Sequence, residues 1–83
     1  MEVVFTRAAN RALTRRIPGP DAKRIVARIE ALATDPRRPR HDVKRLQGRP
    51  ESRLRIGDWR VIFIAEGDTL IVTEIGHRRE IYR

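Results

Sequence analysis

Arginine dominates the chemistry available to this chain of 83 residues, and it gathers in two places. From Arg37 to Arg55 eight cations stand against two acids, and the run His77-Arg78-Arg79 precedes Tyr82 and Arg83. Because guanidinium groups bind phosphate oxygens in pairs and stack on bases, both groups indicate a partner with many phosphates. The formal net charge of +8 agrees with such a partner. Two plainer explanations stay open: a GC-rich genome, which raises the arginine content without a functional reason, and a basic surface that only keeps the protein soluble.

Cleavage of RNA without a metal ion is a reaction that such a surface can support. It requires a base for the ribose 2′-hydroxyl, an acid for the leaving 5′-oxygen, and cations that stabilise the dianionic transition state. Arginines supply the cations, but a guanidinium holds its proton so tightly that it is a poor base. For proton transfer the sequence offers His77, Tyr82 and, as a weaker choice, His41. Two structural roles stay open: Tyr82 as an aromatic cap on the core, and His77 as an ordinary residue at the end of a strand.

The composition excludes several other classes of chemistry. Without cysteine the chain has no disulfide, thiolate–metal or thiol-nucleophile site. No set of Asp, Glu and His residues has metal-ligand spacing, and no glycine-rich phosphate loop is present. A hydrophobic share of 40% leaves little room for a cofactor cavity, so we expect no cofactor and no metal. No apolar run approaches the roughly 20 residues of a membrane helix. We therefore expect one cytoplasmic domain over residues 1–83.

Two helices are expected in the first half of the chain, after a short strand. Glu2-Val3-Val4-Phe5 is apolar and β-branched and predicts that strand. Thr6 is the expected N-cap of the first helix, which ends at Pro18-Gly19-Pro20. The second helix is amphipathic and is predicted from near Asp21 to Asp35-Pro36. The tight turn between the two helices makes them antiparallel neighbours.

The second half of the chain changes to an extended pattern. Residues 37–48 predict an irregular connection with a short turn around Val43–Leu46. The predicted strands and turns that follow are Arg53-Leu54-Arg55-Ile56, the hairpin turn Gly57-Asp58, Trp59–Ala65, the turn Glu66-Gly67-Asp68, and Leu70–Ile75. The strand Leu70–Ile75 is expected to be central and buried, and Gly76 to break it. The tail after Gly76 is expected to add a last strand or half-turn.

The predicted order β-α-α-β-β-β is an α+β fold with two helices on one face of a small antiparallel sheet. No further element remains to cover the other face, and Arg53, Arg55 and Arg60 take strand positions on it. The hairpin brings the first two beside Arg60, since cross-strand neighbours lie about 5 Å apart. Like charges at that spacing destabilise the sheet unless an anion lies between them. This face is therefore the expected phosphate-binding surface.

Three motifs together resemble the RelE/ParE superfamily of toxins. The stretch from Arg53 to Phe63 is similar to the family's "RLRxGDxR" motif, and the stretch from Ile75 to Arg83 to its "GHRxxxYR" motif. Lys44-Arg45-Leu46-Gln47-Gly48 resembles the family's "K-x-L-x-G" approach to the sheet. The resemblance covers nearly the whole chain and is strongest to the RelE-like branch. It implies a RelE-like fold and a toxin of a type II toxin–antitoxin pair.

RelE-like toxins enter the ribosomal A site and cleave the mRNA there without a metal, and the resemblance implies the same activity here. In that scheme Arg60 and Arg78 hold the scissile phosphate, and Tyr82 orients or activates the 2′-hydroxyl. Arg55 assists proton transfer, although some relatives have lysine on this strand, which makes His77 a second choice for this role. The residues expected to bind RNA around these four are Arg53, Lys44, Arg45, Arg79, Arg83 and His77.

Family membership also implies partners. The cognate antitoxin would be a small acidic, RelB-like protein whose C-terminal segment wraps the toxin, covers the basic cleft and displaces the tail. The pair would bind its operator DNA through the antitoxin. Two alternatives stay open: a ParE-like toxin that inhibits DNA gyrase, and a non-catalytic module that binds RNA or the ribosome. ParE-like members generally lack the arginine–tyrosine tail, which speaks against the first alternative, whereas the missing obvious base favours the second.

Overall fold

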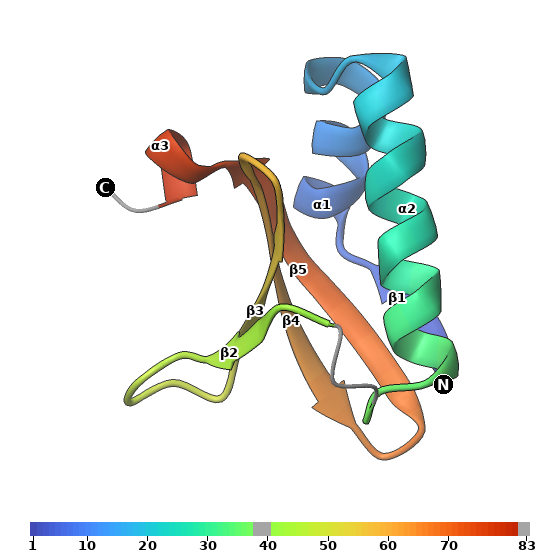
Figure 1. Ribbon diagram of the computed structural model, residues 1–83, viewed down its shortest axis with the longest axis vertical. Coiled ribbons are helices and arrows are strands. Elements are labelled where there is room, and N and C mark those ends of the chain that lie inside the picture. The colour runs from blue at the N-terminus through green and yellow to red at the C-terminus, as the bar shows by residue number, and fades with distance from the viewer. Residues whose placement is uncertain (38–40, 82–83) are drawn as a thin grey trace.

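One five-stranded sheet forms the centre of the computed structural model, which describes residues 1–37 and 41–81 (Figure 1). The strands lie in the order β1-β5-β4-β3-β2. β1 runs parallel to β5, and each other neighbouring pair is antiparallel. The strands are β1 (Glu2–Phe5), β2 (Val43–Arg45), β3 (Ser52–Ile56), β4 (Trp59–Glu66) and β5 (Thr69–His77). The predicted α+β class is therefore confirmed, with β5 as a central strand.

Two predictions about the sheet are wrong. The turn expected around Val43–Leu46 is instead strand β2, because Lys44 pairs with Arg53 of β3 and extends the sheet by one strand. The break expected at Gly76 does not occur, since Gly76 pairs with Arg60 of β4 and β5 continues to His77. The tail that follows is neither a strand nor a half-turn but a short helix, α3 (Arg78–Ile81).

The first helical segment changes its hydrogen-bond pattern halfway along. It begins as the α-helix α1 (Arg7–Arg11) and continues as the π-helix η1 (Ala12–Arg16). Thr6 is the N-cap, as predicted: its Oγ1 accepts a hydrogen bond from the Ala9 amide at 3.3 Å and donates one to the Thr73 carbonyl at 2.9 Å. The cap therefore starts the helix and ties it to β5.

The second helix, α2 (Gly19–Thr34), begins two residues earlier than expected. Pro20 fits there because the first turn of a helix has no partner for its amide groups. The helix ends before Asp35-Pro36, as predicted. No helix in the described parts of the chain is long and apolar enough to cross a membrane.

The core lies between the sheet and the helices α1, η1 and α2, while α3 lies on the opposite face of the sheet (Figure 1). A bulge keeps β5 in this core. The pairing register shifts between Ile62 and Phe63 of β4, so that both Val72 and Ile75 of β5 are buried in the core. The Thr73 hydroxyl stabilises the bulge by donating a hydrogen bond to the Ile62 carbonyl at 3.2 Å. The buried core side chains are Ala9, Ala12, Ile17, Ile25, Ile29, Leu32, Leu54, Ile56, Val61, Phe63, Leu70, Val72 and Ile75.

Candidate functional site

The sheet face away from α1 and α2 carries the cations of three neighbouring strands. On β3, Arg53 and Arg55 alternate with the buried core residues Leu54 and Ile56, so both arginines lie on the other face. Arg55 pairs directly with Arg60 of β4, as the predicted hairpin requires. Arg53 pairs with Lys44 of β2 on one side. We call the surface made by Lys44, Arg53, Arg55 and Arg60 the open face.

Arg60 is the one charged side chain that is buried within the described residues, with 8% of its surface exposed. Its Nη1 donates hydrogen bonds to the carbonyls of Gly57 at 2.7 Å and Trp59 at 3.0 Å. Its Nε is buried and has no hydrogen-bond partner, and no carboxylate of the described chain forms an ion pair with the guanidinium. Burial of a charge is costly unless an anion pairs with it. Arg60 therefore presents a buried donor and an uncompensated charge to an anion.

The C-terminal helix lies over the open face beside Arg60. A Cβ atom at Gly76, which pairs with Arg60, would lie 3.2 Å from Cδ1 and 3.3 Å from Cγ1 of Ile81. Ile81 therefore packs against β5 in the space that a glycine leaves free. Gly76 was expected to break the strand. Instead, its lack of a side chain leaves room for α3 to dock.

Arg78 and Arg60 are both bound to the turn between β3 and β4. The Arg78 amide donates to the Asp58 carbonyl at 2.8 Å, and its Nε lies 3.5 Å from Asp58 Oδ1. Arg60 donates to Gly57 of the same turn. Both side chains of the Arg78–Asp58 ion pair are more than half exposed. Ion pairs at the surface contribute about 0–1 kcal/mol to the stability of a protein. A phosphate can therefore compete with Asp58 for Arg78.

A second exposed ion pair holds Arg55. Its Nε lies 3.8 Å from Asp42 Oδ2, and its amide donates to the Asp42 carbonyl at 2.9 Å. Sequence reasoning did not identify Asp42 or Asp58 as ion-pair partners. The place of Asp58 in the hairpin turn was visible in the sequence. Its ion-pair partner was not, because Arg78 lies 20 residues further along the chain. Asp42 therefore neutralises Arg55 of the open face, and Asp58 neutralises Arg78 of α3.

The structure separates His77 from the open face. His77 pairs with Trp59, and their rings make a T-shaped contact with centroids 5.7 Å apart. Trp59 packs against the core, so this pair lies on the helix side of the sheet. His77 Nδ1 accepts a hydrogen bond from the amide of Arg79, which is exposed on α3. The structure therefore does not bring His77 together with Arg60.

The remaining predicted site residues lie in other places. Arg45 pairs with Ser52, so it points to the side of β2 opposite Lys44. His41 Nε2 lies 2.9 Å from the Asp35 carbonyl at the end of α2. Tyr82 and Arg83 lie outside the described residues.

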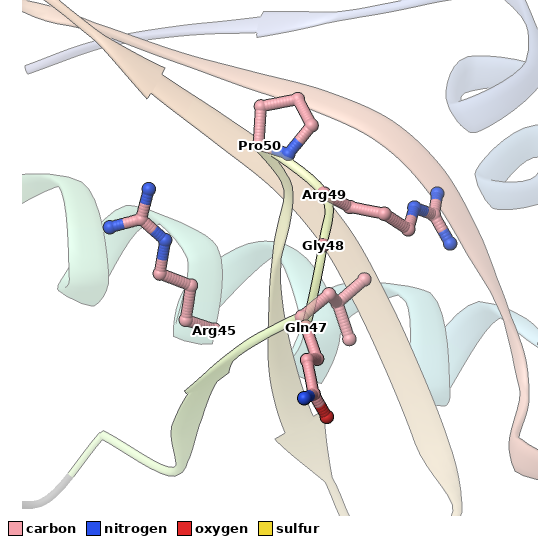
Figure 2. A pocket seen from close by; sticks show the side chains of 6 residues that line it. Arg45, Gln47, Gly48, Arg49 and Pro50 are labelled. Carbon is pink, nitrogen blue, oxygen red and sulfur yellow. The ribbon is translucent and has the colours of Figure 1, made fainter.

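A hollow of about 600 Å³ lies at the loop between β2 and β3, where Arg45 and Arg49 point away from one another (Figure 2). Gly48 allows the loop to turn, since its φ is +71°. Arg49 Nη2 donates to Glu51 Oε2 at 3.0 Å. This hydrogen bond raises the pKa of Arg49 and lowers that of Glu51. The loop thus carries a paired charge and no group poised for proton transfer.

Comparisons with known proteins agree with this fold. The family described as the ParE toxin of the type II toxin–antitoxin system parDE matches residues 3–82. The chain is similar to a chain of the RelB–RelE antitoxin–toxin complex of Methanococcus jannaschii, with 28% identity, a TM-score of 0.78, and coverage of 95% of this chain and 94% of that one. It is also similar to the RelE–RelB complex of Pyrococcus horikoshii OT3, with 24% identity, a TM-score of 0.76 and coverage of 93% of each chain.

The isolated E. coli RelE toxin has the same fold, with 14% identity, a TM-score of 0.73, and coverage of 92% of this chain and 82% of that one. No curated protein matches the sequence. The family match nevertheless spans all but the ends of the chain. This protein belongs to the ParE toxin family within the RelE/ParE superfamily, and it is the toxin of a type II toxin–antitoxin system, folded like RelE.

Proposed function

We propose that this toxin is a ribosome-dependent endoribonuclease that cuts mRNA without a metal ion. The observation that supports this most is the environment of Arg60: a buried guanidinium with an unpartnered Nε, opposite Arg55 and anchored to the same turn as Arg78. Arg55 and Arg60 hold paired positions on one face of the sheet, and Arg78 is tied to the turn that joins their strands. A scissile phosphate is an anion that would compensate them.

In the proposed reaction, Arg60 and Arg78 hold the scissile phosphate, and Arg78 exchanges Asp58 for a phosphate oxygen. The ribose 2′-hydroxyl loses its proton and its oxygen attacks phosphorus, while the 5′-oxygen leaves and takes up a proton. The product ends in a 2′,3′-cyclic phosphate, and no metal is required. The extra negative charge of the transition state falls on the two arginines, which is the interaction that accelerates the reaction.

We assign the proton steps to Tyr82 and Arg55. Tyr82 orients or activates the 2′-hydroxyl, and Arg55, directly opposite Arg60, assists proton transfer. His77 is less suitable because it lies on the helix side of the sheet, beside Trp59. Arg53 and Lys44 extend the open face and bind the message on either side of the cut.

The proposed partners follow from the charge and the relatives. The similar chains from Methanococcus jannaschii and Pyrococcus horikoshii were crystallised in RelB–RelE complexes. We propose that an acidic RelB-like antitoxin binds this chain, whose net charge is +8, and covers the open face. Operator DNA is bound through the antitoxin. The target ribosome places the activity in the cytoplasm.

Inhibition of DNA gyrase is the second candidate function. The matching family is that of ParE, which the sequence motifs had placed second. RNA cutting and gyrase poisoning leave different products, so one experiment separates them.

The test is induced expression in bacteria of the native chain, Arg60→Ala and Tyr82→Phe, with Arg28→Ala on α2 as a charge-matched control. We expect growth to stop and translated messages to be cut within codons for the native chain and the control. Both site variants should leave the messages whole. If growth stops while messages stay intact and chromosomal DNA is broken, gyrase is the target and the proposed endonuclease is wrong.

A further inference from the structure

A second cationic surface lies on the first helical segment, on the side of the sheet that α3 does not occupy (Figure 1). Arg7, Arg11 and Arg15 are all exposed. Together with Asn10 and Thr14 they line one hollow of about 270 Å³. We call these three arginines the helix row. None of them belongs to the site described above.

The stability of the helix does not explain the helix row. Like charges four residues apart destabilise a helix, and Arg7 in the first turn opposes the helix dipole. No acid occurs from residue 3 to residue 20. Within the described chain, no carboxylate pairs with Arg7, Arg11 or Arg15, and their side chains make no hydrogen bond. The helix row is therefore a set of unpaired guanidinium groups that lower the stability of the helix.

The π-helical turn keeps the row straighter than an α-helix would. In an α-helix residue i+4 lies about 40° beyond residue i, so a row at this spacing drifts around the axis. In η1 the Ile17 amide donates to the Ala12 carbonyl at 3.0 Å, five residues back. This wider turn holds more residues, so residue i+4 falls short of a full turn there. The two offsets act in opposite senses, so Arg15 drifts less from the line of Arg7 than it would in an unbroken α-helix.

We propose that the helix row binds the phosphate backbone of double-helical RNA. Guanidinium groups match phosphate oxygens in pairs, and duplex RNA is recognised mainly through its backbone and shape. A protein partner would instead need apolar anchors. The hollow of the helix row is lined only by arginine, asparagine and threonine. The neighbouring hollow, which contains Leu13 and Val26, shares Asn10 and Thr14 with it but none of the three arginines.

This inference goes beyond the proposed cleavage of mRNA and does not depend on it. The row and the open face lie on different sides of the molecule, so the protein would contact two segments of RNA at once. A single-stranded message would lie across the open face. A double-helical RNA would lie along the helix row.

The test measures binding of a 20-base-pair RNA duplex to the full chain by fluorescence anisotropy over a series of salt concentrations. All proteins carry Arg60→Ala, so cleavage plays no part in the result. The test variant is R7Q/R11Q/R15Q. The control K23Q/R24Q/R28Q removes three cations from α2, and R7K/R11K/R15K keeps the charge of the row. A thermal melt checks that each variant folds.

If the row holds three phosphates, the slope of log affinity against log salt falls by about 2–3 in R7Q/R11Q/R15Q, since each contact contributes about 0.9. The control should lose less than one unit, and the lysine variant should keep most of the slope. Should the triple variant fail to fold, each single glutamine variant is expected to lower the slope by about 0.9.

Equal slopes for the test variant and the control would overturn the proposal, because binding would then follow net charge alone. It would also be overturned if R7Q/R11Q/R15Q bound the duplex like the native row but lost binding to polyglutamate. That outcome would assign the row to an acidic protein.

Discussion

Replacing Gly76 with alanine tests how α3 is held over the open face. The new Cβ would lie 3.2 Å and 3.3 Å from two side-chain atoms of Ile81, so Ile81 would have to move. Overpacking costs about 1–3 kcal/mol. Ile81 is only half-buried and ends a helix of four residues, so the low end of that range applies. The cost falls on the docking of α3 and not on the whole fold.

A change of about 1 kcal/mol raises the population of undocked α3 about fivefold. Trypsin cuts after Arg78 and Arg79, which are exposed but held in the helix. Because native-state proteolysis follows the open population when opening is fast, we expect cleavage at these two residues about fivefold faster in Gly76→Ala. The thermal midpoint of the protein should change little, since Gly76 does not have a positive φ.

Ile81→Ala supplies the matched control. Without Cγ1 and Cδ1 of Ile81 the new Cβ has no close neighbour in α3. Gly76→Ala should therefore have no further effect on proteolysis in the Ile81→Ala background. If Gly76→Ala speeds cleavage equally in both backgrounds, or leaves it unchanged in the native one, the docking argument is refuted.

Two further changes test the charges of Arg60 and of the loop between β2 and β3. Arg60→Met removes a buried, unpaired charge and keeps much of the side-chain volume. The free energy of unfolding in urea should therefore stay within about 1.5 kcal/mol of the native value or rise, while RNA cutting is lost. A fall of several kcal/mol would mean that the charge of Arg60 stabilises the fold. Glu51→Gln tests acid stability. The hydrogen bond from Arg49 lowers the folded pKa of Glu51, so its stabilisation is full above the unfolded pKa, about 4.3, and is lost as pH falls through the folded pKa. The difference in unfolding free energy between native chain and variant should therefore shrink on acidification, and a difference that stays constant with pH would contradict the assignment.

Local signals predicted most of the fold. Thr6 caps α1, Asp35-Pro36 follows the end of α2, and Gly57-Asp58 turns the hairpin, because each of these depends on a few neighbouring residues. Strand β2 did not show in the pattern, since its three residues are exposed and become a strand only by pairing with β3. The π-helical turn likewise has no local signal.

The site was predictable where it follows from hairpin geometry. Alternation along β3 and the two-residue turn were enough to place Arg55 opposite Arg60. The burial of Arg60 could not be predicted in this way, because alternation along β4 gives the face of a side chain and not what covers it. The face of His77 depends on the register between β4 and β5, which pairs it with Trp59. A register cannot be read from one strand alone.

The parallel pairing of β1 with β5 has a consequence for how the molecule folds. Phe5 pairs with Val72, and the hydrogen bond from Thr6 to Thr73 joins residues 67 positions apart. The hairpins of β3, β4 and β5 need only short loops to close, whereas β1 has no partner until β5 is formed. Contacts between distant residues slow folding because a long loop must close before they form. Docking of β1, and with it the seating of α1 on the sheet, is therefore the late step, and the hairpins that carry the open face form before it.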